Sequence, residues 1–348
     1  MTIVVVGAGA IGLLVAGQLA RSSQRIVLLA RPATAAAIRQ QGVRILHHGQ
    51  LHAVRDLAVI TDPTALDPQD HAPDLAILCI KGYDTVGAMP ALDALGPRTI
   101  LTLQNGIGNE ELLAERFGAE RIVSGAITSS VEVEMPGRVA VARNGGIGLA
   151  PLVPRTEVGC WAAMLRAADF RVREYADYRA LKWSKAVLNM LGNATAAILD
   201  MPVEAVYADR RLVALEWQMV REALLVMDRL GIQAVNLPHY PVALLARAMR
   251  WAPAAALGPL LRRAVAGGRG GKPPSLHLDL ARGSRRSEGE FLYGAVASAA
   301  EQAGVAAPVN RKLWAILHAI ATGELPWSTY RHQPDRLLAA LAATSDRP

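Results

Sequence analysis

A glycine-rich turn at the start of the chain restricts the fold more than any other feature of the sequence. The turn consists of Gly7, Ala8, Gly9, Ala10, Ile11 and Gly12. It directly follows a short apolar run, Thr2–Val6, and precedes a helix-like stretch that reaches about Arg21. In such a G-x-G-x-x-G pattern Gly7 allows a tight turn, Gly9 a close backbone approach to a pyrophosphate, and Gly12 close packing of helix on strand. The pattern predicts a dinucleotide-binding β-α-β unit, and a glycine-rich turn without a ligand is the alternative.

Strand-like and helix-like segments alternate through the first half of the chain and give way to helices in the second. The predicted strands are 2–6, 25–30, 75–80, 99–103, 122–127, 138–143, 146–149 and 170–174, with a helix near 157–168. The helices predicted after Tyr178 are 178–199, 205–231, 240–265, 288–304 and 308–322, with a Gly- and Pro-rich loop over Ala266–Pro274. Strands separated by helix-length segments indicate a parallel α/β sheet. We therefore expect a dinucleotide-binding domain over residues 1–176 and a helical substrate domain over residues 177–348.

The composition excludes several other classes of protein. The two cysteines, Cys79 and Cys160, rule out a disulfide framework and show no metal-ligand spacing, so no metal site is expected. The sequence shows neither an export signal nor a run of about eighteen apolar residues, so we expect a cytoplasmic protein without a membrane span. The net charge of +7 comes from dispersed arginines. It suits an anionic cofactor and an acidic substrate better than it suits nucleic acid.

Basic and polar residues follow three of the predicted strands, at the edge where doubly wound sheets bind ligands. Arg31 stands directly after the second strand, where an acidic residue would select NAD, and a guanidinium there can hold the 2′-phosphate of NADP. Lys81 and Asn105 follow two further strands and are candidates for the nicotinamide half of the cofactor. The competing interpretations are a solvated surface arginine and an ordinary Asn-Gly turn.

The first predicted helix of the second half carries a polar stripe in apolar surroundings. Lys185, Asn189 and Asn193 stand at i, i+4 and i+8, on one narrow face of a continuous helix. Because a buried ammonium and carboxamides need partners, the stripe faces either a polar cleft or acceptors in neighbouring helices. Glu288 is a further acidic candidate before an apolar helix. Simple helix-dipole complementation is its plainer explanation, and Glu290 is its competitor.

In their order and spacing these pieces resemble the ketopantoate reductase (2-dehydropantoate 2-reductase) family over nearly the whole chain. The matching pieces are Gly7–Gly12, Arg31, Lys81, Gln104–Gly108, Trp183–Lys185 with Asn189 and Asn193, Ser275–Asp279, Glu288 and Gly304–Pro308. The resemblance implies a Rossmann-type doubly wound sheet followed by an all-helical domain of the 6-phosphogluconate-dehydrogenase type. It also implies an enzyme of pantothenate biosynthesis that reduces 2-dehydropantoate to pantoate with NADPH.

The resemblance further implies a role for each matching residue. Lys185 would be the catalytic lysine that protonates the ketone oxygen, and Glu288 would orient the substrate hydroxyl, the lysine and the cofactor. Asn105 would lie by the nicotinamide ribose and the substrate. The residues implied to hold the substrate's carboxylate and hydroxyl are Asn189, Asn193 and Ser275. An ammonium suits this chemistry, because it stabilises charge on the ketone oxygen and also supplies a proton. Lys182 is the alternative lysine from sequence alone, and the asparagine stripe favours Lys185.

A few residues depart from the family pattern on the substrate side. Tyr293 replaces an Asn of the usual Glu-x-x-x-x-Asn-Gly, and Val203 stands where a substrate-contacting Asn can occur. The segment 251–272 looks like an insertion that adds Arg262, Arg263, Arg269 and Lys272. Two alternatives therefore stay open: a paralogous NADPH-dependent reductase of another 2-oxo acid or carbonyl, and a non-catalytic NADP-binding sensor. Long apolar helices such as 210–231 are compatible with a homodimer.

Overall fold

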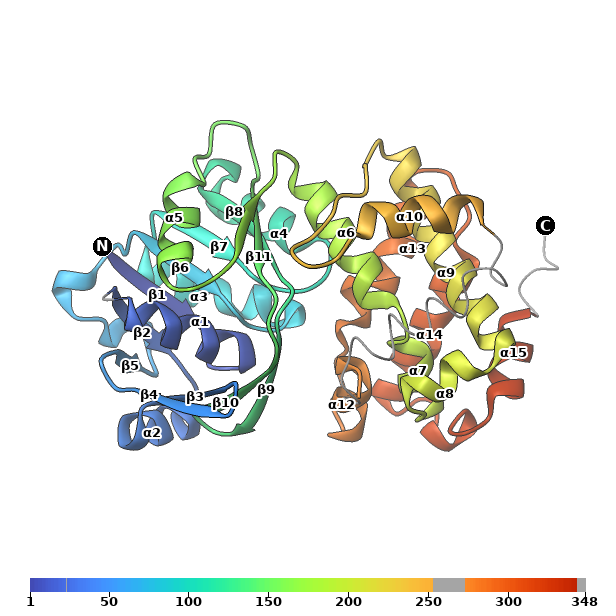
Figure 1. The fold of residues 1–348 in the computed structure, drawn as a ribbon, viewed down its shortest axis with the longest axis horizontal. Coiled ribbons are helices and arrows are strands. Elements are labelled where there is room, and N and C mark those ends of the chain that lie inside the picture. Colours follow the sequence, from blue (N-terminus) through green and yellow to red (C-terminus); the bar gives the residue numbers. More distant parts are fainter. Residues whose placement is uncertain (23, 253–272, 343–348) are drawn as a thin grey trace. The chain divides into compact units, whose positions relative to one another are not determined.

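The chain folds into two compact units, seen in a computed structural model that describes residues 1–22, 24–252 and 273–342 (Figure 1). Unit 1 comprises Met1–Lys182 and Leu237–Tyr240, and unit 2 comprises Trp183–Asn236 and Pro241–Pro348. The change from unit 1 to unit 2 falls inside helix α6 (Tyr178–Met190), a few residues after the boundary that we placed at 176.

An eight-stranded sheet forms the centre of unit 1, in the order β12-β11-β8-β7-β6-β1-β2-β5. Its strands are β1 (Thr2–Val6), β2 (Arg25–Leu29), β5 (Ala58–Ile60), β6 (Leu75–Leu78), β7 (Thr99–Thr102), β8 (Ile122–Ile127), β11 (Ile147–Pro151) and β12 (Val172–Glu174). All pairings are parallel except that of β8 with β11. The strand order reverses beside β1, which pairs with both β2 and β6. This arrangement confirms the predicted doubly wound sheet and creates the crevice at which such sheets bind ligands.

Alternate side chains of β1 enter two separate apolar cores, so both faces of the sheet are covered. The helices of unit 1 are α1 (Ala10–Arg21), α2 (Pro32–Gln41), α3 (Thr85–Leu95), α4 (Asn109–Phe117) and α5 (Gly159–Ala167), with 3-10 turns η1 (Pro63–Ala65), η2 (Pro68–Asp70), η3 (Gly82–Asp84) and η4 (Ala119–Arg121). Ile3 and Val5 pack with α1, whereas Val4 and Val6 pack with α3 and α4. A strand that is buried on both faces reads as a continuous apolar run, which is why the sequence predicts these strands well.

A second, four-stranded sheet in unit 1 was not predicted. Its order is β4-β3-β10-β9, with β3 (Val43–His47), β4 (Gln50–Val54), β9 (Ser130–Met135) and β10 (Arg138–Arg143). Of these strands the sequence predicted β10 alone. The side chains of β4 and β9 are mostly exposed, and neither strand is an apolar run. The sequence of β9 does alternate polar and apolar residues, and this signal of a strand was overlooked. The pairing of β3 with the distant β10 holds this sheet together, and local patterning does not reveal such a pairing.

Residues 237–240 belong to unit 1 although the chain on either side of them belongs to unit 2. They form a tight turn in which Leu237 and Tyr240 exchange backbone hydrogen bonds. The Thr128 hydroxyl donates to the Pro238 carbonyl at 3.2 Å, and the guanidinium of Arg143 lies over the Tyr240 ring. Unit 1 is therefore completed by a segment from late in the chain.

Unit 2 is helical throughout its described residues, as predicted. Its helices are the remainder of α6, then α7 (Ala194–Leu199), α8 (Val203–Ala208), α9 (Arg210–Arg229), α10 (Val242–Trp251), α12 (Ser275–Ala281), α13 (Tyr293–Gln302), α14 (Pro308–Thr322) and α15 (Pro334–Ala342), with 3-10 turns η5 (Glu288–Phe291) and η6 (Trp327–Thr329). The long helix α9 packs against α8, α10, α13, α14 and α15 and is the scaffold of the unit.

Three predicted helices are each divided in two by the structure. The predicted helix 178–199 ends at Met190 and resumes as α7, and 205–231 divides at Asp209, whose carboxylate accepts from the Arg211 amide and caps α9. The predicted helix 288–304 begins instead as the 3-10 turn η5. Side chains cap the starts of α9 and η5, whereas α7 and α13 begin without a side-chain cap. The apolar periodicity does not reveal these breaks. The part of the predicted helix 240–265 after residue 252, the predicted loop up to 272, and Arg262, Arg263, Arg269 and Lys272 lie outside the described residues.

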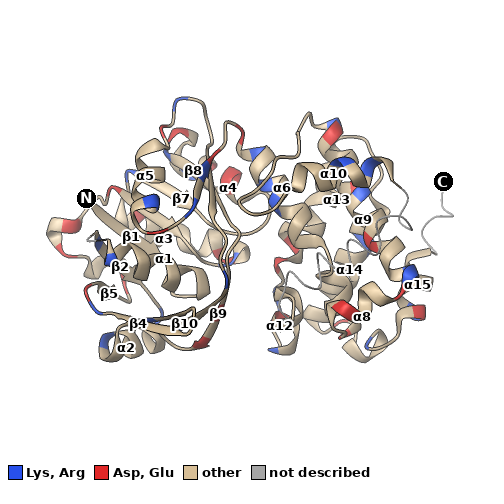
Figure 2. Cartoon of the chain, in the orientation of Figure 1, with Lys and Arg blue, Asp and Glu red and all other residues tan. Residues whose placement is uncertain are grey.

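Charged residues of both signs are interspersed over the elements of both units (Figure 2). Many arginines pair locally with a carboxylate, as Arg116 does with Asp93 and Arg166 with Glu174. Within the described residues no helix is both long enough and apolar enough to cross a bilayer.

We predict that Gly12→Ala destabilises unit 1 strongly. A Cβ at this position would lie 1.8 Å from the Gly7 carbonyl oxygen, so either α1 or the turn would have to move. We expect a loss of about 3 kcal/mol in the free energy of unfolding, measured by urea denaturation. The control is Gly87→Ala, at an exposed site in α3 with no atom within 4 Å of the added Cβ. Alanine there should be neutral or add about 0.5–1 kcal/mol. Equal effects of the two substitutions would contradict this account of the turn.

Candidate functional site

Four loops of unit 1 meet at one edge of the large sheet, because they follow the carboxyl ends of four adjacent parallel strands. In the order of the sheet these strands are β7, β6, β1 and β2. The residues predicted to bind the cofactor follow them in the same order: Asn105, Lys81, Gly7–Gly12 and Arg31. The structure thus brings the predicted cofactor residues to one edge, on both sides of the point where the strand order reverses.

The glycine turn has the shape that a pyrophosphate requires. Gly7 has a φ of +103°, and Gly12 lies so close to it that no side chain fits between them. At Gly9, in contrast, an added Cβ would meet a single atom, the Cys79 carbonyl oxygen at 4.0 Å, and the space beyond it is open. No acidic residue stands in the first turn of α1, and no side chain caps it. The free N–H groups of α1 and the open space above Gly9 therefore fit a bound phosphate.

The surroundings of the turn carry charges that also suit a phosphate. Burial raises the pKa of the Cys79 thiol, so this neighbour stays neutral. The Arg31 side chain is 87% exposed and lies 3.9 Å from the Asp84 carboxylate, too far for a hydrogen bond. This loose ion pair does not hold the guanidinium in one direction. An exposed arginine directly after β2 can bind a 2′-phosphate, and it can equally be a solvated surface residue.

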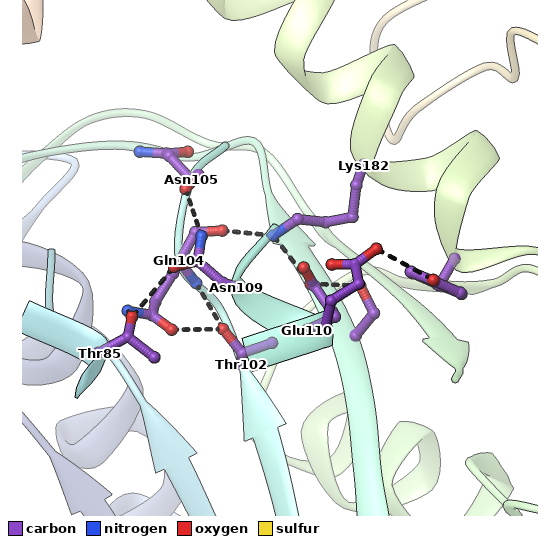
Figure 3. A network of polar contacts seen from close by, with 10 residues as sticks. Thr85, Thr102, Gln104, Asn105, Asn109, Glu110 and Lys182 are labelled. Atoms are coloured by element: carbon purple, nitrogen blue, oxygen red, sulfur yellow. Dashed lines mark hydrogen bonds and ion pairs between the residues drawn. The ribbon is translucent and has the colours of Figure 1, made fainter. Parts of the chain in front are cut away.

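The loop that carries Asn105 is held by a buried polar network (Figure 3). The Gln104 side chain, 3% exposed, accepts from the Thr102 hydroxyl at 2.9 Å and donates to the Thr85 hydroxyl at 2.8 Å. On the other side of the loop, the Asn109 carboxamide donates to the Asn105 carbonyl at 3.1 Å. The loop is therefore anchored to β7, to the start of α3 and to the start of α4.

Lys182 is part of the same network and forms a buried ion pair (Figure 3). Its ammonium donates to the Gln104 carbonyl at 2.6 Å and lies 3.0 Å from the Glu110 carboxylate, and the two side chains are 3% and 1% exposed. The Ser124 hydroxyl donates to the same carboxylate oxygen at 2.7 Å. Sequence reasoning missed this pair, because its members are far apart in the chain. The sequence feature that could have indicated the pair is Glu110, an acidic residue in the first turn of α4 directly after a glycine-rich loop.

The predicted asparagine stripe does not lie on one continuous helix. Lys185 and Asn189 are half-buried on α6, but Asn193 stands at the start of α7, after a break at residues 191–193. The Asn193 carboxamide donates to the Asn189 carbonyl at 3.1 Å and accepts from the Leu276 amide at 3.3 Å. It thus joins the α6–α7 corner to the first turn of α12, which begins at the exposed Ser275. This bridge corresponds to the structural interpretation that the sequence left open for the stripe.

Two buried side chains stabilise the α6–α7 corner. Gly192 has a φ of +62°, and its amide donates to Glu216 of α9 at 2.6 Å. The Tyr293 hydroxyl donates to the Met190 carbonyl at 2.7 Å and accepts from the Ala194 amide at 2.9 Å. Tyr293 is fully buried, so the residue that departs from the family pattern connects the two helices across their break.

Burial distinguishes the two acidic candidates before α13. Glu288 is 5% exposed, directly after Ser287, whose hydroxyl caps η5 by accepting from Gly289. Glu290 is exposed. The buried carboxylate favours Glu288 as the functional residue of this segment. Among the described residues no group of three or more His, Cys, Asp or Glu side chains is arranged to hold a metal ion.

Comparisons with known proteins find similarity along most of the chain. Residues 3–153 match the family model "Ketopantoate reductase PanE/ApbA", and residues 177–321 match "Ketopantoate reductase PanE/ApbA C terminal". The 2-dehydropantoate 2-reductase of Pyrococcus abyssi is 27% identical over 91% of this chain and 97% of its own length. A PanE/ApbA family ketopantoate reductase from Ralstonia eutropha superposes with a TM-score of 0.78 at 25% identity, over 93% of this chain and 99% of that structure. A D-mandelate dehydrogenase with NADH and anilino(oxo)acetate shares the fold, with a TM-score of 0.78 at 21% identity over 93% and 99% of the two chains.

We predict that Tyr293→Phe lowers the free energy of unfolding by about 1–3 kcal/mol, because the buried Ala194 amide loses its acceptor. The Met190 carbonyl loses one of two donors and keeps the Asn193 amide. Thermal and urea denaturation measure this change. Tyr330→Phe, at a half-buried tyrosine of the same unit, is the control and should shift stability by less than about 0.5 kcal/mol. A Tyr293→Phe protein as stable as the wild type would show that the hydroxyl does not stabilise the corner.

Proposed function

This chain belongs to the ketopantoate reductase family, and we propose that it catalyses the NADPH-dependent reduction of 2-dehydropantoate to pantoate, a step of pantothenate biosynthesis. The two family matches together include the strands of unit 1 other than β12 and most of the helices of unit 2. The observation that carries the proposal is the geometry of the glycine turn. Its open space above Gly9 and its uncapped helix lie at the crevice of the sheet, beside the loop of Asn105.

The residues of unit 1 hold the cofactor in this proposal. NADPH, when bound, supplies the hydride for the carbonyl carbon. The Gly7–Gly12 turn binds the pyrophosphate through backbone N–H groups, and Arg31 binds the 2′-phosphate. Lys81 and Asn105 bind the nicotinamide half, and Asn105 also contacts the substrate.

The residues of unit 2 bind the substrate and move the proton. Lys185 donates a proton from Nζ to the ketone oxygen and stabilises the negative charge that develops there. Lys182 does not suit this role, because its ammonium is buried against Gln104 and Glu110. Glu288 orients the lysine and the substrate hydroxyl. Asn189 and Ser275 bind the substrate, and Asn193 places Ser275 through its bond to the first turn of α12.

A reductase of another 2-oxo acid is a second candidate, and two observations favour it. The Tyr293 hydroxyl is engaged by the α6–α7 corner, so it does not take over hydrogen bonds of an asparagine to a ligand. Val203 is 3% exposed and apolar where a substrate-contacting asparagine can occur. Both changes fall among the residues proposed to surround the substrate, and the proposed cofactor residues of unit 1 match the family pattern.

The test of function is NADPH oxidation with 2-dehydropantoate and a panel of other 2-oxo acids. The proposal requires the highest kcat/KM for 2-dehydropantoate. A higher kcat/KM for another acid would favour the second candidate. Cofactor binding without turnover of any acid would indicate a sensor and would contradict both.

We predict that Arg31→Asp raises the KM for NADPH by about 10- to 100-fold and leaves the KM for NADH nearly unchanged, because a charge-assisted hydrogen bond to the 2′-phosphate is lost. Initial rates with each cofactor measure the effect. Arg55→Asp, at another exposed arginine of unit 1, controls for the change in overall charge. The shared fold does not decide the cofactor, since the D-mandelate dehydrogenase is described with NADH. Equal effects on both cofactors would contradict the role of Arg31.

We predict that Lys185→Ala lowers kcat by about 10²- to 10⁴-fold with little change in NADPH affinity, since the general acid is removed and the cofactor residues stay. Stopped-flow turnover and fluorescence titration separate the two quantities. Lys312→Ala, on α14 of the same unit, is the matched control. Near-normal turnover of Lys185→Ala would exclude this lysine as the acid.

A further inference from the structure

The buried pair of Lys182 and Glu110 does more than neutralise two charges. We propose that Lys182 is a positioning residue of the active site: its ammonium fixes the Gln104 carbonyl and thereby the backbone of Asn105. This inference rests on the proposed function, which assigns Asn105 to the nicotinamide ribose and the substrate.

The distances show that the ammonium is bound by a backbone group as well as by its counter-ion. The Nζ atom lies 2.6 Å from the Gln104 carbonyl oxygen and 3.0 Å from the Glu110 carboxylate. Glu110 has two further sources of stabilisation, the Ser124 hydroxyl and the positive end of α4. An ammonium that only neutralised Glu110 would not need a hydrogen bond to the Gln104 carbonyl. The bond to Gln104 places the ammonium directly at the start of the candidate cofactor loop.

The loop needs such an anchor because of its own sequence. Gly106 and Gly108 follow Asn105, with φ angles of +91° and +103°, and glycines permit many other backbone conformations. The conformation of Asn105 therefore depends on bonds at both of its sides. Asn109 holds its carbonyl from the C-terminal side, and Lys182 holds the preceding carbonyl, that of Gln104.

Helix α6 connects this anchor to the proposed acid. The Tyr178 hydroxyl donates to the Glu111 carboxylate at 3.1 Å, one helical turn before the contact of Lys182 with Glu110. Burial, and then the nearby carboxylates, raise the pKa of Tyr178 further above neutral pH, so its hydroxyl is a hydrogen-bond donor. At about 100° per residue, Lys185 lies within about 60° of Lys182 around the helix axis. One face of α6 thus bonds to the start of α4 and, a turn later, carries Lys185.

The experiment separates positioning from stability with a charge-neutral double variant. Lys182→Met alone leaves the Glu110 charge buried without its partner and is expected to unfold at a lower temperature. Lys182→Met/Glu110→Gln removes both charges at nearly constant volume and should recover most of the melting temperature. The Gln104 carbonyl still lacks the ammonium donor that it has in the wild type. We therefore expect the double variant to stay folded and to show about 10- to 100-fold lower kcat with 2-dehydropantoate, together with weaker NADPH binding by fluorescence titration.

The matched control is an ion pair at the opposite edge of the same sheet. Arg25, the first residue of β2, pairs with the buried Asp70, far from the carboxyl ends of the strands. Arg25→Met/Asp70→Asn should change the melting temperature and leave kcat and NADPH affinity unchanged.

Two results would overturn the positioning role: wild-type kcat and NADPH affinity in the Lys182→Met/Glu110→Gln variant, or an equal loss in the Arg25→Met/Asp70→Asn control. NADPH affinity tests the loop even if the wild type turns over no 2-dehydropantoate. In that case the proposed substrate fails, and weaker NADPH binding in the double variant alone still supports the positioning role. A wild type that binds neither NADPH nor NADH would overturn both proposals.

Discussion

The parallel pairing of β1 with both β2 and β6 determines where every proposed cofactor residue lies. Parallel strands deliver their following loops to the same edge, so these pairings bring the glycine turn beside the loops of Arg31 and Lys81. The pairing of β6 with β7 adds the Asn105 loop. Helix α1 also lies close to the end of β1, and the absence of a side chain at Gly12, beside Gly7, permits that approach. The chemistry of unit 1 thus depends on backbone packing more than on any one side chain.

Buried carboxylates organise both units in a similar way. Glu110 binds Lys182 at the start of α4, and Glu216 of α9 accepts from the Gly192 amide before α7. Glu222, also on α9, accepts from the Val309 and Asn310 amides at the start of α14. Burial raises the pKa of Glu222 against the effect of these donors. In each case a carboxylate lies near the positive end of a helix. Glu216 and Glu222, both on α9, fix in this way where α7 and α14 of unit 2 begin.

The sequence predicted the features that local patterns determine and missed those that distant partners determine. The buried strands of the large sheet read as apolar runs, and the glycine turn has a fixed spacing, so both were found. Strands β4 and β9 are mostly exposed and are held by pairing across the small sheet. The break before Asn193 depends on Glu216 and Tyr293, which approach from elsewhere in the chain, and helical periodicity continues through it. For the candidate site, the sequence predicted that the loops after β1, β2, β6 and β7 share one edge, which the structure has, but it did not predict the partner of Lys182.

The turn of Leu237–Tyr240 has a consequence for how the protein is synthesised. This turn completes unit 1, yet Trp183–Asn236, which belong to unit 2, precede it in the chain. The ribosome therefore releases the last piece of the cofactor-binding unit only after about the first third of unit 2. Vectorial folding of unit 1 stays incomplete until then, and no single proteolytic cut can separate the two units into fragments that each contain all of their own residues.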